Sequence, residues 1–285
     1  MTSEHLSFRR KAVNVVMLSL TGVFTFLTVS TLFLILGYLI YYGGRSLDIN
    51  FFTKLPLPPG ELGGGMANAI VGSVKIVAMA ALIGLPFGFL AGVYLSEFED
   101  KLFSSVVRYV ADLLNGIPSI VVGLLAWTLV VVPTRTFSGL AGSIALAVML
   151  IPIVTRQTEQ FLREVPLSLR EGALALGASK WKTIATVVVP AGSKGILTGM
   201  ILGVARIAGE SAPLLFTAFN NQFWGGGITQ PTASLPVMIY SHAIAPYEDW
   251  HRQAWAAGLV LIAMVLIANI AARLVLARGV SVPRG

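Results

Sequence analysis

Long, almost uncharged apolar segments are the feature that most restricts the fold of this chain. They recur in blocks of roughly 20 or more residues, the length that an α-helix needs to cross a hydrocarbon core of about 30 Å. The 285 residues are 55% hydrophobic and only 12% charged, with a mean hydropathy of +0.81. A soluble domain usually has about a quarter of its residues charged. We therefore expect an integral membrane protein.

The apolar blocks predict an all-α fold with six transmembrane helices, because membrane β-barrels show short alternating segments instead. The first block is far longer than the h-region of a signal peptide, about 7–15 residues, so we expect it to be retained. Residues 1–13 and 278–285 then flank one transmembrane domain, residues 14–277. The expected spans are 14–42, 67–95, 116–132, 139–161, 194–219 and 253–277.

Lys and Arg are distributed unevenly between the two sets of loops, and this bias predicts the orientation of the chain. The outer loops would carry only Arg45, Lys54, Arg135 and Arg252. We expect both termini and the loop 163–192 on the cytoplasmic side, so the net charge of +7 is mostly a topology signal and does not indicate nucleic-acid binding. The inner set is Arg9, Arg10, Lys11, Lys101, Arg108, Arg163, Arg170, Lys180, Lys182, Lys194, Arg273, Arg278 and Arg284.

Three further segments are expected outside the membrane. Residues 43–66 and 220–252 are rich in Gly and Pro and are predicted to be outer loops. Residues 96–115 predict an amphipathic helix on the inner surface, which would rest either on lipid or on the protein. Its apolar positions at helical spacing are Leu102, Val106, Tyr109, Val110 and Leu113.

No constellation of catalytic or metal-binding residues is apparent. The chain has no cysteine, and its three histidines lack the spacing of metal ligands. Gly172 and Gly177 have the spacing of a phosphate-binding loop, but Ala178 stands where that motif needs lysine. We therefore expect no catalytic activity, no metal and no cofactor on the chain itself.

Charged residues inside the expected spans are the first candidate site. A central Arg or Lys costs roughly 2.5–3.5 kcal/mol there. Arg206 and Glu210 would share a helix face and pair, as would Arg156 and Glu159. These charges either hold helices together or line a path for an anion, and the arginines favour the anion because guanidinium binds oxyanions through paired hydrogen bonds. Lys75 is a weaker candidate, since it lies near the outer end of its span.

Glycine and proline predict interrupted helices beside these charges. The spacing of Gly195, Gly199 and Gly203 allows close helix approach, and Ser211-Ala212-Pro213 follows. Gly116-Ile117-Pro118-Ser119 opens the third span. Broken helices expose backbone N–H groups near a pathway, so Ser211 is a further weak candidate; the alternative is a kink that serves packing alone.

A polar segment, Glu171 to Gly192, separates two apolar blocks. Ser168 and Glu171 fit a capping box that opens a helix, Gly177 permits a turn, and a second helix from about Lys180 is expected to end before Pro190. Two short helices would form a compact knob for a cytoplasmic partner. An ordinary loop resting on lipid headgroups is the alternative.

The knob resembles the EAA loop through which permeases of ABC importers engage their ATPases, although Gly172 replaces the second residue of the Glu-Ala-Ala triplet. The runs RIAGESAPLLFT (206–217), NQFW (221–224), Leu235-Pro236 and RQTE (156–159) are similar to PstA-type permeases of bacterial phosphate ABC importers. The similarity covers the chain from about residue 115 onward.

This resemblance implies a MetI-like permease in a bacterial inner membrane. It implies Arg156, Arg206 and Glu210 on the phosphate path; Lys75, Ser211 and Glu159 remain weaker candidates from the charge and helix-break patterns alone. The ATPase-coupling residues would be Glu171, Ala173, Gly177, Ala178, Ser179 and Pro190. The implied partners are a PstC-type permease, two PstB-type ATPases that bind ATP and Mg²⁺, and a PstS-type binding protein. A permease for molybdate, sulfate or phosphonate, and a secondary transporter with an Arg206–Glu210 proton relay, remain as alternatives.

Overall fold

The computed structural model describes residues 2–61, 63–98, 101–225 and 227–279, and this part of the chain is helical without a strand. Among the described residues, five helices are long and apolar enough to cross a membrane. The number is up to six if the bent pair Leu102–Gly116 and Ser119–Thr134 counts as one span. The predicted all-α membrane fold is therefore confirmed.

Helix α7 (Gly139–Arg163) is the centre of the bundle, and 61% of its most hydrophobic 18-residue stretch is buried. Helices α3 (Ala67–Glu97) and α10 (Val189–Ala208) pack along it. A Cβ added at Gly88 of α3 would lie 2.7 Å from Val154 Cβ, which is too close for any larger residue. Small residues bring the helix backbones together in lipid, and here they are Gly84, Gly88 and Gly92 on α3 and Gly195, Gly199 and Gly203 on α10.

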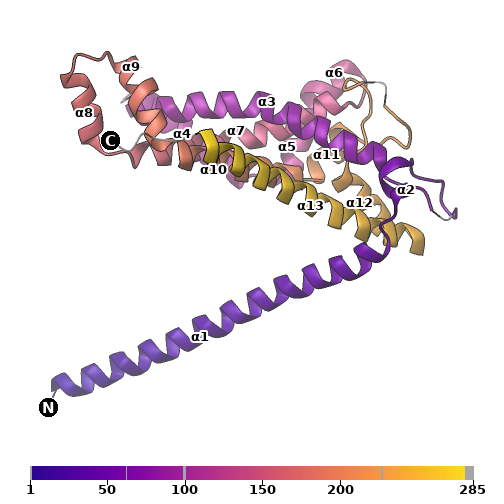
Figure 1. Cartoon of the computed structure of the whole chain (residues 1–285), viewed down its shortest axis with the longest axis horizontal. Helices are drawn as coiled ribbons and strands as arrows, with labels where there is room; N and C mark the ends of the chain where they lie inside the picture. The colour runs from indigo at the N-terminus through magenta and orange to yellow at the C-terminus, as the bar shows by residue number, and fades with distance from the viewer. Residues whose placement is uncertain (1, 62, 99–100, 226, 280–285) are drawn as a thin grey trace.

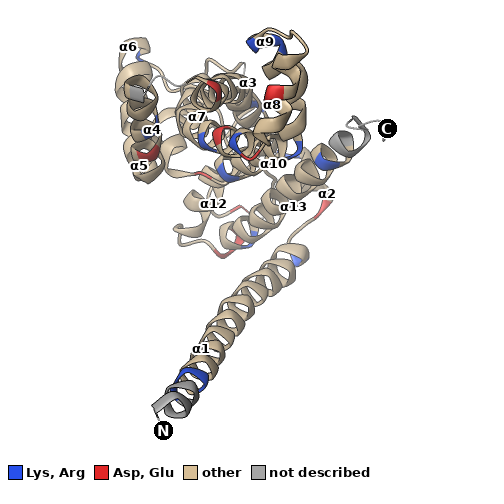
Figure 2. Ribbon diagram, turned by 90° about the vertical axis from the view of Figure 1, so that its left-hand side faces the viewer, with Lys and Arg blue, Asp and Glu red and all other residues tan. Residues whose placement is uncertain are grey.

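Helix α1 (Thr2–Tyr38) and the π-helical turn η1 (Leu39–Gly43) extend away from the bundle as one long helix (Figure 1). Its C-terminal end contacts the bundle, where Tyr42 stacks on Trp255 of α13 (Glu248–Gly279). Charged residues lie toward its two ends and the shaft between them is uncharged (Figure 2). Only 6% of its most hydrophobic 18-residue stretch is buried, so this surface requires lipid or another protein chain.

The two outer segments contain short helices that the sequence analysis described only as loops. Asp48 is the N-cap of helix α2 (Ile49–Thr53), and its carboxylate accepts a hydrogen bond from the Phe51 N–H. Helix α12 (Leu235–Ala243) packs against the start of α13. Both lie at the end of the bundle opposite α8 and α9 (Figure 1).

The prediction that a helix ends before Pro190 was wrong. One helical stretch runs from α9 (Lys180–Thr183) through the π-helical turn η3 (Ile184–Val188) into α10. In that turn the Val189 N–H donates to the Ile184 carbonyl, five residues back. The wider turn precedes Pro190, which has no N–H to donate, and the helix continues beyond the proline. The fifth span therefore begins well before residue 194.

The same arrangement recurs in the third span. Helix α5 (Ser119–Ala126) continues into a π-helical turn, η2 (Trp127–Val131), and then α6 (Val132–Thr134). The Val132 N–H donates to the Trp127 carbonyl, and Pro133 follows directly. In each case a proline lies two residues after the end of a π-helical turn.

Candidate anion path and coupling knob

Two helices break next to each other, as the glycine and proline pattern predicted. Helix α4 (Lys101–Gly116) meets α5 at a bend of 106°. Helix α10 ends at Ala208 and α11 (Ala212–Thr217) follows after Gly209, Glu210 and Ser211. The two broken helices touch, since a Cβ at Gly123 of α5 would lie 2.7 Å from Pro213 Cα.

A cavity of about 300 Å³ lies at these breaks, and both Arg206 and Glu210 line it. Arg206 is exposed and Glu210 is half-buried. The predicted ion pair between them was wrong: within the described part of the chain, no ion pair of 4.0 Å or less joins Arg206 to a carboxylate. Because α10 ends at Ala208, Glu210 lies beyond the helix and not one turn above Arg206. Ser211 is half-buried in the same linker, outside the lining of the cavity.

Glu159 forms the second charged cluster, and its side chain is only 4% exposed. Arg108 Nε donates to its Oε1 at 2.6 Å, Arg156 Nη1 to its Oε2 at 2.7 Å, and Arg163 Nη2 to its Oε1 at 3.0 Å. Arg156 also pairs with Asp112 at 3.0 Å. The predicted Arg156–Glu159 contact is therefore present. Sequence analysis missed Arg108, Asp112 and Arg163 as members of the cluster.

Helix α4 supplies two of the missed residues, Arg108 and Asp112, because its polar face packs on α7. All five of its predicted apolar positions are exposed. The polar face of this helix therefore rests on the protein. The apolar face points away from the chain and is left for lipid or another protein.

The knob consists of α8 (Leu167–Ala175), the corner at Gly177 and α9. The predicted capping box is absent, since α8 begins one residue before Ser168 and its N-cap is Pro166. Gly177 has φ +83°, the left-handed conformation that glycine tolerates.

The corner of the knob closes by a hydrogen-bond pattern typical of glycine-ended helices. The Ala178 N–H donates to the Ala173 carbonyl at 3.1 Å, and the Gly177 N–H to the Leu174 carbonyl at 2.9 Å. This is a Schellman motif with glycine at its left-handed position. The hydroxyl of Ser179 then caps α9 by accepting from the Lys182 N–H. Four of the predicted coupling residues thus build the corner.

The remaining predicted coupling residues, Glu171 and Pro190, are both exposed, Glu171 on α8 and Pro190 at the first turn of α10. Leu176, at the corner, is 91% exposed, and Leu174 and Trp181 are also exposed. The knob therefore offers an apolar tip that nothing else in the described chain covers.

Residues 84–279 match the family of binding-protein-dependent transport system inner membrane components. The chain is 47% identical to the phosphate transport system permease protein PstA of Yersinia pestis, over 83% of this chain and 80% of that protein. It is 44% identical to the PstA of Haemophilus influenzae, over 96% and 97% of the two chains. The chain belongs to the PstA family. It is thus a membrane component of a binding-protein-dependent transport system.

Solved permease structures share the fold of this PstA-family chain. The inward-facing MetNI methionine ABC transporter aligns with TM-score 0.62 and 18% identity, over 75% of this chain and 95% of that one. A bacterial alginate ABC transporter aligns with TM-score 0.66 and 15% identity, over 96% and 97%. The predicted MetI-like permease fold is therefore confirmed.

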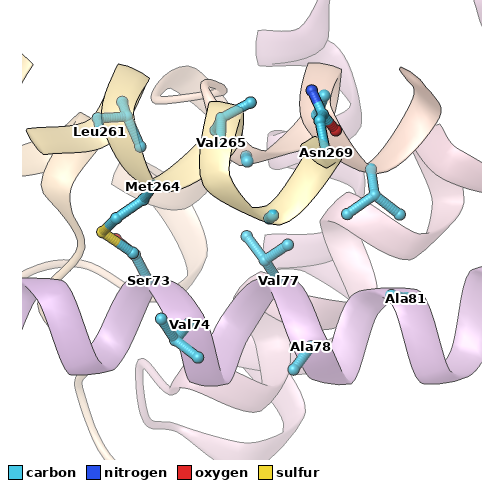
Figure 3. Close-up of a pocket in the computed structure, with 13 residues that line it drawn as sticks. Ser73, Val74, Val77, Ala78, Ala81, Leu261, Met264, Val265 and Asn269 are labelled. Carbon is cyan, nitrogen blue, oxygen red and sulfur yellow. The ribbon is translucent and has the colours of Figure 1, made fainter. Parts of the chain in front are cut away.

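Lys75 and the most apolar cavity of the PstA-family chain are separate from the two charged clusters in the lining residues that they involve. Lys75 is exposed on α3 and lines none of the cavities described here. A cavity of about 240 Å³ between α3, α10 and α13 is walled by small and apolar side chains, with Ser73 and Asn269 at its edges (Figure 3). Since no charged residue lines it, this cavity would not stabilise an anion.

Proposed function

We propose that this chain is the permease subunit of an ATP-driven, high-affinity importer of inorganic phosphate. It would lie in a bacterial inner membrane with both termini in the cytoplasm. The observation that carries the proposal is Arg206, whose guanidinium lines the cavity at the two helix breaks without an ion-pair partner in the described chain. A charge in a membrane segment is expensive unless it is solvated or paired, and a passing anion would pair with it. The relatives named phosphate transport permeases support phosphate as that anion.

The neighbouring carboxylate of Glu210 favours phosphate over some other oxyanions. At neutral pH phosphate still carries at least one proton, so it donates a hydrogen bond to Glu210 while its other oxygens accept from Arg206. Sulfate and molybdate carry no proton and would be repelled by the carboxylate. Glu210 also weakens the hold of the site on any anion, which suits a site that must release its cargo.

The chain would form only half of the path, together with a PstC-type permease. The exposed position of Arg206 and the uncovered surface of α1 both suit a second permease packed against this one. A PstS-type binding protein would deliver phosphate to the outer face, where α2, α12 and the start of α13 lie. Two PstB-type ATPases, which bind ATP and Mg²⁺, would sit beneath the knobs of the two permeases.

The mechanism would be alternating access. Closure of the ATPases around ATP moves the knob, the helices tilt, and phosphate passes from the binding protein to the cavity beside Arg206 and Glu210. Reopening exposes the inner side, where Arg156 and Arg163 border a second cavity of about 380 Å³. The membership in a binding-protein-dependent family favours this mechanism over a secondary transporter.

Replacement of Arg206 by glutamine tests the proposal. We expect Arg206→Gln to lower phosphate uptake by the reconstituted complex at least about 100-fold, since about 3 kcal/mol of charge-assisted bonding to the anion is lost. The complex should still assemble, because the side chain of Arg206 makes no hydrogen bond or ion pair with another residue of the described chain. Arg273→Gln, which removes an exposed arginine near the C-terminal end of α13, is the control.

Uptake of radiolabelled phosphate into proteoliposomes, with ATPase co-purification as the assembly check, measures both effects. Wild-type uptake by Arg206→Gln would contradict the assignment of the path. Loss of assembly would instead indicate that Arg206 has a packing role. Competition by unlabelled sulfate or molybdate as strong as that by phosphate would point to the alternative oxyanion.

A further inference from the structure

Arg170 is a buried arginine that joins the knob to the membrane bundle. Its side chain is 17% exposed, and that of Glu97 at the end of α3 is 7% exposed. Arg170 Nη2 lies 2.9 Å from Glu97 Oε1, and Nε lies 3.4 Å from Oε2, so the contact is two-pronged. Two-pronged Arg–carboxylate contacts fix orientation as well as distance.

The same guanidinium also bonds to the last turn of α7 and to the linker that follows it. Arg170 Nη1 donates to the Val165 carbonyl at 2.6 Å and Nη2 to the Leu162 carbonyl at 2.7 Å. Arg170 belongs to α8, so one side chain ties the first helix of the knob to the two most tightly packed helices of the bundle.

The second helix of the knob reaches the same end of α3. The ring of Phe98, next to Glu97, lies 5.4 Å from that of Trp181, and the ammonium of Lys180 lies 4.3 Å above the Phe98 ring. Both knob helices therefore hold the last turn of α3, and movement of the knob relative to α3 would break contacts at both.

The last turn of α3 is also bonded to the charged cluster on α7. Arg108 Nη2 donates to the Leu95 carbonyl at 2.9 Å, while its Nε bonds Glu159 at 2.6 Å. Leu95 and Glu97 are two residues apart, so a continuous set of bonds runs from Arg170 through α3 to Arg108, Glu159 and Arg156.

We propose that the Arg170–Glu97 contact is the positioning link that transmits movement of the knob to α3 and to the arginine cluster at Glu159. This inference rests on the proposed importer function. Arg170 itself is too buried to bind the ATPase, and the exposed tip at Leu176 stays available for that contact. Loss of the link should therefore uncouple ATP hydrolysis from transport while the ATPase remains bound.

The double variant Arg170→Gln with Glu97→Gln tests the link in the complete complex, because it leaves no unpaired buried charge. We expect the ATPase to co-purify and hydrolyse ATP, while phosphate taken up per ATP falls at least tenfold. Arg273→Gln, which removes an exposed arginine from the far end of α13, is the control. An unchanged ratio of uptake to hydrolysis would overturn the inference. So would a double variant that fails to assemble, since the contact would then be structural alone.

A distance measurement gives a second readout that does not depend on the identity of the substrate. The chain has no cysteine, so Leu167→Cys on the knob and Leu82→Cys on α3, which are 65% and 71% exposed, give this chain two defined sites for spin labels. We expect trapping of nucleotide by vanadate to leave this distance unchanged in the otherwise wild-type complex and to shift or broaden it in the double variant.

The two readouts separate the inference from the function on which it rests. The rigid link would be overturned if nucleotide trapping changed the distance between the labels in the otherwise wild-type complex. It would also be overturned if trapping left that distance constant in the double variant. An otherwise wild-type complex that keeps the distance constant and hydrolyses ATP but takes up no phosphate would refute the proposed substrate and leave the link standing.

Discussion

At the scale of single residues, substitution of Glu159 is expected to lower the stability of the fold, whereas substitution of Arg206 is not. Glu159 is 4% exposed and neutralises three arginines, so Glu159→Gln leaves these charges without their shared partner. Removing one member of a buried ion pair usually costs about 3–5 kcal/mol. We expect a clear fall in the thermal unfolding temperature of the purified complex, whereas Arg206→Gln should leave that temperature unchanged.

Arg163→Gln is the control for this prediction. Arg163 bonds the same carboxylate but its side chain is 54% exposed, and exposed pairs contribute about 0–1 kcal/mol. Unfolding of Glu159→Gln at the wild-type temperature would show that the cluster does not stabilise the fold. The cavity beside Arg156 and Arg163 would then have to be examined as an anion site, as well as the cavity beside Arg206.

The charged residues also show what a single sequence can predict at this scale. The pairing of Arg156 with Glu159 was predictable because both residues lie on one uninterrupted helix at a spacing of three. The same rule failed for Arg206 and Glu210, since the helix ends between them. The bonds from Arg108 come from another helix, and no spacing rule within one helix reveals such a partner.

At the scale of elements, the two glycines of the knob differ in backbone conformation, and this predicts opposite effects of alanine. Gly177 has φ +83°, and an added Cβ would meet no atom within 4 Å, so the cost of Gly177→Ala is backbone strain of about 1–2 kcal/mol. Gly172 lies inside α8, also with open space around it. Gly172→Ala should therefore stabilise α8 by about 0.5–1 kcal/mol.

Retention of the ATPase on purified complex during salt washing would measure the effect of both substitutions. We expect Gly177→Ala to lose ATPase at lower salt than wild type, because the corner that presents Leu176 is altered. Gly172→Ala should retain it at least as well as wild type, which makes it a matched control. Equal retention by both variants would count against the knob as the docking element.

Existence and type of the long helices were predictable here, while several boundaries and the short outer helices were not. Apolar length alone indicates each long helix, and Gly-Ile-Pro at 116–118 correctly indicated a break. Pro190 gave a wrong boundary because a preceding π-helical turn accommodates it, and the sequence carries no simple mark of such a turn. The short helices α2 and α12 depend on packing against distant segments, which local patterns do not contain.

At the scale of the whole molecule, the proposed orientation in the membrane rests on the expected excess of Lys and Arg on one side. The exposed tip of the knob, Leu176, and the exposed Phe223 of the outer segment lie on opposite sides in this orientation. Since the chain has no cysteine, a single Leu176→Cys or Phe223→Cys provides one reactive thiol. In intact cells a membrane-impermeant maleimide should label Phe223→Cys and should not label Leu176→Cys until the membrane is opened.

The same experiment links orientation to mechanism. A knob inside the cell is where ATP is available, and an outer surface formed by α2, α12 and the start of α13 is where a binding protein would deliver cargo. Labelling of Leu176→Cys in intact cells, with Phe223→Cys protected, would reverse the topology and with it the direction of transport. Labelling of Phe223→Cys that decreases when a phosphate-loaded binding protein is added would further place the docking surface on α12 and its neighbouring loop.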